Sequence, residues 1–122
     1  MTLYQKIQDL EKTVNNGNTL PLTKLPKQSR VITGVKNGNI IYTHGSQPST
    51  SYFSIDLLYK SYLLLQTMGE LSKCNLEHID ANYTLSGTPC NAVTFMLLMN
   101  YFFNCKIKGS GTRNSPYVVI WQ

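Results

Sequence analysis

Basic and small polar residues gather in three segments of this chain, running from Lys24 to Arg30, from His44 to Tyr52 and from Lys106 to Asn114. Lysine and arginine supply positive charge to phosphates, and serine, threonine, asparagine and glutamine supply hydrogen bonds. Glycine lets main-chain N–H groups approach an anion closely. The side chains that we expect to contact nucleic acid are Lys24, Lys27, Arg30, His44, Ser46, Gln47, Ser49, Ser51, Tyr52, Lys106, Lys108, Arg113 and Asn114.

The distribution of charge along the chain favours a polyanionic partner. The 122 residues contain 11 basic and 6 acidic side chains, and the formal net charge is +5. There is no acid between Lys12 and Ile55, and none from Ala81 to the C-terminus. Two long stretches without negative charge create a positive potential that attracts nucleic acid. A basic surface that only keeps a protein soluble is the alternative explanation, and it stays open.

Two tyrosines, Tyr52 and Tyr83, fall in polar segments that we expect to be loops. There an aromatic ring can stack on an exposed base, as in proteins that bind single strands or flipped bases. A half-buried ring with its hydroxyl in water is the alternative interpretation of both.

Catalytic and metal-binding constellations are weak in this sequence. Cys90 stands at the second position of a predicted helix, where the helix dipole can lower a thiol pKa, and His44 or His78 would have to be its base. A cysteine beside an apolar helix is more often buried and inert. Zinc ligands could be drawn from Cys74, His78, Cys90 and Cys105, but there is no CxxC pair. Carboxylate pairs of metal-dependent nucleases and nucleotide-binding glycine motifs are absent, so we expect no enzyme activity, metal or cofactor.

The longest apolar run, TPCNAVTFMLLMNYFF, predicts a helix from about 89 to 103. Thr88 can cap its first turn, and Pro89 suits the first helical position. Apolar residues lie on almost every face of this helix, which predicts that it is enclosed by other elements. The run is shorter than the roughly 20 residues that span a bilayer, so we expect no membrane segment.

The N-terminal half predicts a helix and a hairpin. Thr2 can cap a first helix, in which apolar residues recur at Leu3, Ile7, Leu10 and Val14. The next stretch, TLPLTKLPKQSR, is expected to be an extended loop lying on the core. Asn37-Gly38 is the favoured dipeptide of a type I′ turn, and it predicts a β-hairpin that pairs residues 30–36 with 39–44.

The C-terminal half predicts two more helices before the apolar one, and a second hairpin after it. Ser54 can cap a helix over 55–68 that has Asp56 in its first turn and ends at Gly69. Ser72 can cap a short helical turn over about 73–79. The segments CKIKG and SPYVVIW then predict two strands, joined by the polar tip SGTRN.

These elements predict a single compact α+β domain over 1–122, in which the central apolar helix is packed by the other helices and by two β-hairpins. The ending resembles a winged helix, with the last hairpin as the wing. In a winged helix the helix before the wing is polar and enters the major groove, whereas this one carries no charge. Contacts to DNA are therefore expected from loops and hairpin edges.

The region from Val31 to Met99 resembles small N-terminal modules fused to restriction endonucleases. A β-hairpin, a polar loop with spaced serines, the helix of IDLLYKSYLLLQTM, a turn at MGELS and a small-residue-capped apolar helix follow in the same order in those modules. The resemblance implies a module that recognises DNA or senses a modified base, with catalysis on a separate nuclease domain or subunit. It transfers no individual binding residue.

We therefore expect a non-catalytic module that binds duplex DNA, either alone or as the recognition part of a larger protein. Three cysteines at irregular spacings and the absence of a secretory leader predict a cytoplasmic protein. Two alternatives remain open: an inhibitor from a phage or mobile element that binds a nucleic-acid enzyme, and a structural subunit that forms a homodimer. A steep loss of affinity with salt is expected of the DNA-binding module alone.

Overall fold

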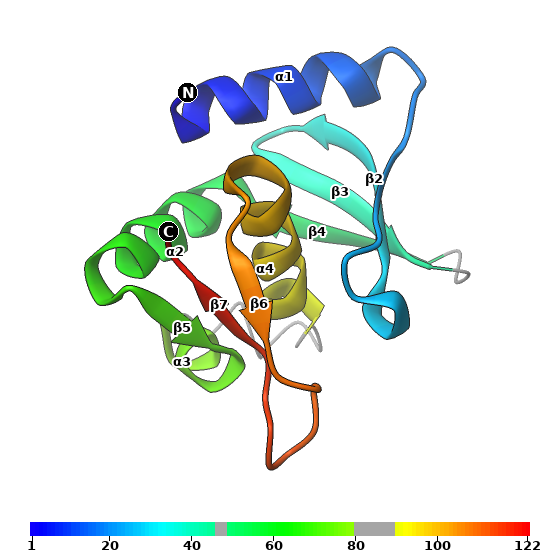
Figure 1. Cartoon of the computed structure of the whole chain (residues 1–122). Helices are drawn as coiled ribbons and strands as arrows, with labels where there is room; N and C mark the ends of the chain where they lie inside the picture. Colours follow the sequence, from blue (N-terminus) through cyan, green and yellow to red (C-terminus); the bar gives the residue numbers. More distant parts are fainter. Residues whose placement is uncertain (46–48, 80–89) are drawn as a thin grey trace. The chain divides into compact units, whose positions relative to one another are not determined.

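The computed structural model describes residues 1–45, 49–79 and 90–122, and for Glu77, His78 and Cys90 it describes the main chain alone. The helices and the two antiparallel sheets give the α+β fold that the sequence predicts (Figure 1). The chain divides into two compact units, Met1–Tyr59 and Lys60–Gln122. The elements in order are α1 (Leu3–Asn15), β1 (Leu20–Leu22), the 3₁₀ helix η1 (Pro26–Gln28), β2 (Arg30–Lys36), β3 (Asn39–His44), β4 (Thr50–Ser54), α2 (Ile55–Met68), β5 (Glu70–Ser72), α3 (Lys73–Ile79), α4 (Cys90–Phe103), β6 (Lys106–Lys108) and β7 (Val118–Ile120).

The first unit is built on an antiparallel sheet with strand order β1-β2-β3-β4. Its central hairpin has the predicted bounds, and the turn residues Asn37 and Gly38 have φ angles of 54° and 77°. Positive φ at both positions is the requirement of a type I′ turn. At the other end of the hairpin, Arg30 stands opposite His44.

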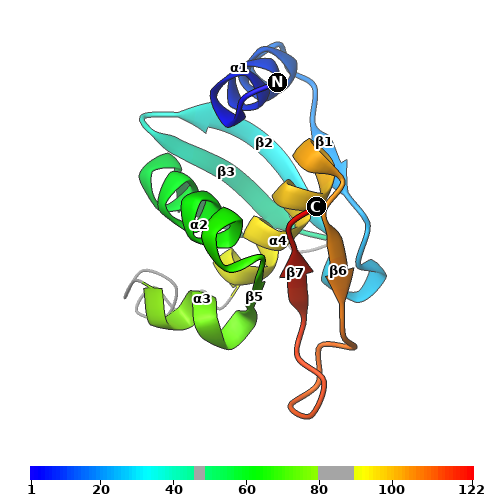
Figure 2. The same ribbon diagram turned by 60° about the vertical axis from the view of Figure 1, so that its left-hand side comes forward.

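The helix α1 forms as predicted and packs on β2 (Figures 1 and 2). Thr2 and Gln5 form a reciprocal capping box, which satisfies two main-chain N–H groups at the start of the helix. The apolar stripe of α1 is buried. At its C-terminal end the side-chain amide of Asn15 donates to the carbonyl of Val35 (3.3 Å) and accepts from the N–H of Val35 (3.5 Å).

Two segments that the sequence predicts as loops contain strands. Within 19–30, β1 pairs with β2 and η1 follows, so this stretch is not only an extended loop. Tyr52 is expected in a polar loop but lies in β4. That strand forms because it completes a ladder with β3, in which Phe53 stands opposite Ile40 and both are fully buried.

The second unit ends in the predicted pair of strands, and this pair forms part of a larger sheet. β7 lies between β5 and β6 and is antiparallel to both. β5 was not predicted from the sequence. With α3, α4 and then the hairpin, the order of elements is the one that the winged-helix comparison predicts. Leu71 and Val119 pair directly across β5 and β7, so they share one face of the sheet, and both are fully buried there.

The helices before α4 begin and end as the sequence predicts. The Ser54 hydroxyl accepts from the N–H of Leu57 at 3.3 Å, and Gly69 ends α2 with a φ of 82°. Ser72 caps α3 by accepting from the N–H of Asn75 at 3.1 Å.

The helix α4 is enclosed along most of its length. Its predicted capping residues, Thr88 and Pro89, lie outside the described residues. The side chains from 91 to 99 are all buried, including the polar Asn91 and Thr94. These residues therefore present no surface for reading bases. In the described part of the chain, every helix is too short or too polar to cross a bilayer.

Candidate nucleic-acid interface

Most of the predicted contact residues that the structure describes lie at two places, one in each unit. The first, the strand-end pocket, is lined by residues 26–30 together with His44 and Gly45. The second, the basic hairpin, comprises residues 106–120 and contains Lys106, Lys108, Arg113 and Asn114. The predicted contacts Ser46 and Gln47 lie outside the described residues, as does Tyr83, for which base stacking is one of two interpretations.

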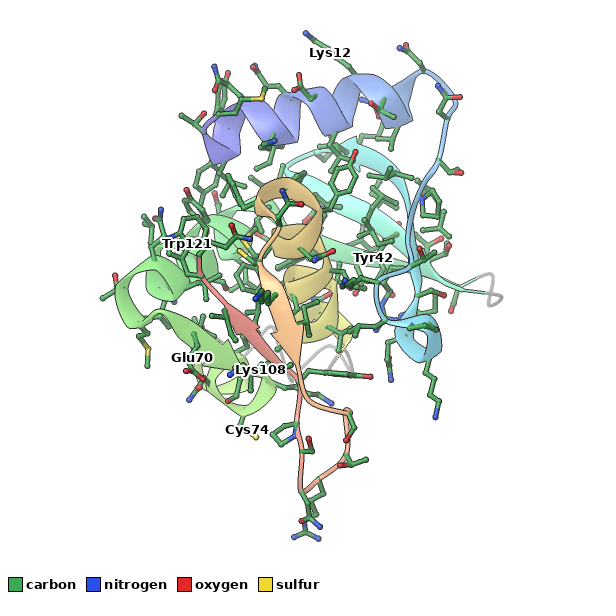
Figure 3. All side chains as sticks on the ribbon, viewed as in Figure 1. Lys12, Tyr42, Glu70, Cys74, Lys108 and Trp121 are labelled. Atoms are coloured by element: carbon green, nitrogen blue, oxygen red, sulfur yellow. The ribbon has the colours of Figure 1, made fainter. Side chains whose placement is uncertain are left out.

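In the basic hairpin, strand alternation sets both lysines on one face of the sheet. Lys106 and Lys108 are exposed. Ile107 between them lies on the opposite face of the sheet, together with its partner Val119. β6 is an edge strand of the three-stranded sheet. Figure 3 shows Lys108 at the point where β6 passes into the turn. Two ammonium groups therefore share one solvent-facing surface beside the turn.

The nearest acid in this sheet is too far from the lysines to neutralise them. Glu70 in β5 and Lys106 in β6 both pair with Ile120, because these two strands lie on opposite sides of β7 (Figure 1). Two strand spacings separate the main chains of these residues by roughly 10 Å, slightly more than the Debye length of about 8 Å at physiological salt. Lys108 faces the neutral Ser72 across Val118. The lysine face therefore keeps its positive potential.

The tip of the basic hairpin is held by a network of short-range hydrogen bonds. The carbonyl of Ser115 accepts from the N–H of Ser110 at 3.0 Å and from that of Gly111 at 2.9 Å. The N–H of Ser115 donates to the carbonyl of Thr112 at 3.1 Å, and the hydroxyls of Ser110 and Thr112 lie 3.2 Å apart. These bonds fix the loop that presents Arg113 and Asn114, whose side chains are exposed.

Two glycines make this tip sterically possible. Gly109 and Gly111 have φ angles of 94° and 78°, a region that favours glycine. A Cβ on Gly111 would lie 2.5 Å from Cε2 of Tyr117, and a Cβ on Gly109 would collide with the carbonyl of Pro116. The tip is thus packed against the start of its own returning strand. The only sign of this packing in the sequence is the glycine-rich composition of the turn.

The strand-end pocket, of about 360 Å³, lies where β2 begins and β3 ends. Lys27 is exposed, but Arg30 is only 3% exposed. The Nη1 atom of Arg30 donates to the carbonyls of Gln28 (2.9 Å) and Ser29 (3.1 Å). Arg30 was predicted to contact nucleic acid together with the lysines; it is instead a buried cation whose orientation is fixed by the chain around η1.

Burial and the neighbouring Arg30 charge both lower the pKa of His44, burial being the larger cause. The imidazole is therefore neutral at pH 7 and can either donate or accept a hydrogen bond. Its ring lies 5.7 Å from that of Tyr42, which is fully buried. Tyr42 thus helps to hold the imidazole at the end of the sheet.

The other predicted contacts in the first unit do not form one surface with the pocket. Lys24 and Ser49 are exposed and do not line it. Ser51 pairs with Tyr42 and shares the face of His44, whereas Tyr52 pairs with Ile41 on the opposite face. Tyr52 is 59% exposed. A ligand that lies on one face of this sheet therefore meets either Ser51 or Tyr52.

The described cysteines and carboxylates do not gather into a metal site. Among the residues that the structure describes, no three His, Cys, Asp or Glu side chains are close enough to hold an ion. Cys74 is exposed and Cys105 is buried. Burial raises the pKa of the Cys105 thiol, while a hydrogen bond with the main chain of Gln122 opposes that shift. A thiol in such a setting is a poor nucleophile at neutral pH.

Comparison of the chain with protein-family models, with curated proteins and with solved structures finds no match.

Proposed function

We propose that this chain is a non-catalytic DNA-binding module that holds the backbone of duplex DNA with its basic hairpin. The observation that carries the proposal is the exposed pair Lys106 and Lys108 on an edge strand, next to a tip that exposes Arg113 and Asn114. Lysine contacts to phosphate supply affinity through counterion release, without regard to base sequence. No acid follows Asp80 in the chain, so the hairpin and its tip are uniformly basic.

The order within the tip supports a role in binding. Hydrogen bonds to Ser115 and the packing of Gly111 on Tyr117 fix the loop before any ligand arrives. A loop that is already ordered loses less conformational entropy on binding than a flexible loop. The ordered tip is therefore better suited to binding a ligand than a flexible turn would be.

The tip is also the best candidate for reading bases. Arginine pairs with the major-groove edge of guanine, and asparagine with that of adenine. Arg113 and Asn114 are these two types, adjacent and exposed. The described part of α4 is buried from 91 to 99, so sequence readout is assigned to the hairpin tip.

The resemblance of 31–99 to modules of restriction endonucleases extends this proposal. In that setting the chain supplies specificity, for a sequence or for a modified base, and a separate nuclease domain or subunit cuts the DNA. Cytoplasmic location is part of the same proposal.

Binding of the purified chain to labelled duplex DNA tests the proposed function. The triple variant Lys106→Ala/Lys108→Ala/Arg113→Ala removes three charges from the basic hairpin. Its matched control is Lys6→Ala/Lys12→Ala/Lys36→Ala, which removes the same charge from α1 and from the turn end of β2. Measurements at about 50 and 200 mM salt separate phosphate contacts from other interactions.

We expect salt-sensitive binding that the hairpin variant weakens by about 100-fold, if removal of each phosphate contact costs about 1 kcal/mol. The control variant is expected to bind almost as tightly as the native chain. Absence of DNA binding at low salt, or equal weakening in both variants, would refute the proposal. Formation of a stoichiometric complex with a nucleic-acid enzyme, without DNA affinity, would favour an inhibitor instead.

A further inference from the structure

The strand-end pocket combines a desolvated cation with an exposed one. Arg30 is 3% exposed and is oriented by the carbonyls of Gln28 and Ser29, while Lys27 lies exposed in the same lining. The remaining polar side chains of the lining are those of Gln28, Ser29 and His44, each of which can donate a hydrogen bond. The lining contains no acid among the described residues.

The position of the pocket in the chain strengthens this positive potential. No acidic residue occurs between Lys12 and Ile55, a stretch that supplies all four strands of the sheet. A charge in a poorly solvated site acts more strongly than one in bulk water, because the effective dielectric constant is lower. The pocket therefore lies in a stretch of the first unit in which every charged side chain is basic.

We infer that the strand-end pocket binds a phosphate group, held by Arg30 and Lys27 and by the hydroxyl of Ser29. Two permanent positive charges match the charge of about −1.5 to −2 that a phosphate monoester carries at pH 7. A carboxylate carries only one charge. Arg30 contributes a fixed charge at the wall of the pocket, where its Nη1 atom donates to the carbonyls of Gln28 and Ser29 and its Nη2 atom donates to the side-chain oxygen of Gln28. This inference is independent of the role proposed for the basic hairpin.

A main-chain hydrogen bond joins the two segments that line the pocket. The N–H of Gly45 donates to the carbonyl of Ser29 at 3.3 Å, which ties the end of β3 to the start of β2. Gly45 has a φ of 30°, and a Cβ there would lie 3.2 Å from the Ser29 hydroxyl. A larger residue at this position would therefore crowd the hydroxyl that we assign to the anion.

The test follows the main-chain N–H signals of the full chain by NMR during titration with defined probes. The probes are inorganic phosphate, acetate, and a short single-stranded oligonucleotide with or without a 5′-phosphate. Signals of residues 27–30 and of 44–45 report on the pocket, whereas those of 106–114 report on the hairpin. The two proposals can therefore fail separately.

We expect phosphate, but not acetate at equal concentration, to shift the pocket signals. Lys27→Gln should weaken phosphate binding about tenfold, as removal of a charge-assisted hydrogen bond implies. Lys24→Gln is the matched control, because Lys24 is an exposed lysine just before η1 that does not line the pocket. Arg30→Lys should weaken binding further, and Ser29→Ala provides a milder variant should Arg30→Lys fail to fold.

The probes also distinguish the source of the phosphate. A shift with inorganic phosphate and with both oligonucleotides alike assigns the pocket to a free phosphate or a phosphodiester. A shift that is strongest with the 5′-phosphorylated oligonucleotide assigns it to a nucleic-acid end. Equal shifts with acetate, equal effects of Lys24→Gln and Lys27→Gln, or no shift at the pocket with any probe would overturn the inference.

Discussion

Gly111 packs against the ring of Tyr117, so closely that a Cβ at Gly111 would lie 2.5 Å from Cε2. Tyr117 is itself mostly buried, with 9% of its surface exposed. The basic tip is thus joined to the start of its own returning strand by a contact that only glycine allows. The shape of the tip depends on this pair as much as on its hydrogen bonds.

Gly111→Ala should destabilise the protein by about 2–4 kcal/mol. The alanine would have to adopt a left-handed backbone conformation, and its Cβ would collide with the Tyr117 ring. Gly69→Ala is the control, since Gly69 has a similar φ of 82° and open space around it. Its cost should be about 1 kcal/mol. Urea unfolding measures both free energies, and equal costs would contradict the packing of Gly111 on Tyr117.

The lowered pKa of His44 predicts a dependence of stability on pH. The unfolded histidine takes up a proton near its ordinary pKa of 6.5, before the folded one does, so protonation favours unfolding. The contribution of His44 is complete above pH 6.5 and is lost as the pH falls through the lowered pKa. The pKa of His44 is lowered by the surrounding chain, which excludes water from the imidazole, and by the positive charge of Arg30. Lys27 is the other charged side chain in the described lining of the same pocket.

The measurement is the urea midpoint of the native chain and of His44→Gln between about pH 7.5 and 5. The native chain should lose more stability over this range than the variant, which has no imidazole to protonate. Parallel curves for the two proteins would show that His44 has the same pKa folded and unfolded. Phosphate in the pocket should raise the pKa of His44 and shift its NMR titration upward, because an anion stabilises the imidazolium.

Alkylation should distinguish the two described cysteine side chains. Cys74 is exposed and should react readily with iodoacetamide, whereas Cys105 is fully buried and its pKa is raised by burial. Peptide mapping by mass spectrometry, in native buffer and in urea, measures both rates. Cys105 should be protected until the protein unfolds, and rapid labelling of Cys105 in native buffer would show that this end of the second unit opens.

The local elements could be predicted because their signals lie within a few residues. Asn37-Gly38 predicts the hairpin with the correct bounds, and Thr2 with the stripe from Leu3 to Val14 predicts α1. These predictions rest on turn chemistry, capping and helical periodicity, none of which needs tertiary contacts.

The strands β4 and β5 could not be predicted, because pairing with other strands creates them. β4 has one strongly apolar residue, Phe53, among serine, threonine and tyrosine, and it forms only as a partner of β3. β5 has three residues and pairs with β7, which lies far away in the sequence. Tertiary pairing overrides a weak local pattern in both strands.

The candidate sites were partly visible in the sequence. The basic hairpin follows from local composition, since Lys106, Lys108 and Arg113 lie within a few residues of one another. The strand-end pocket cannot be predicted from local composition, because it depends on the pairing of Arg30 with His44 across the sheet. The burial of Arg30 could not be predicted from the neighbouring residue types. Its guanidinium is held by the main-chain carbonyls of Gln28 and Ser29, and main-chain carbonyls are present whatever the side chains are.

The salt dependence of binding to duplex DNA tests the role of the basic hairpin most directly. For the native chain, the logarithm of the affinity should fall linearly with the logarithm of the salt concentration. The variant Lys106→Ala/Lys108→Ala/Arg113→Ala should flatten that slope by up to about 3, because each phosphate that is no longer neutralised reduces it by about 0.9. The control Lys6→Ala/Lys12→Ala/Lys36→Ala should leave the slope almost unchanged. A native chain without measurable affinity at low salt, or a slope that the hairpin variant does not change, would contradict the assignment of the phosphate contacts to this hairpin.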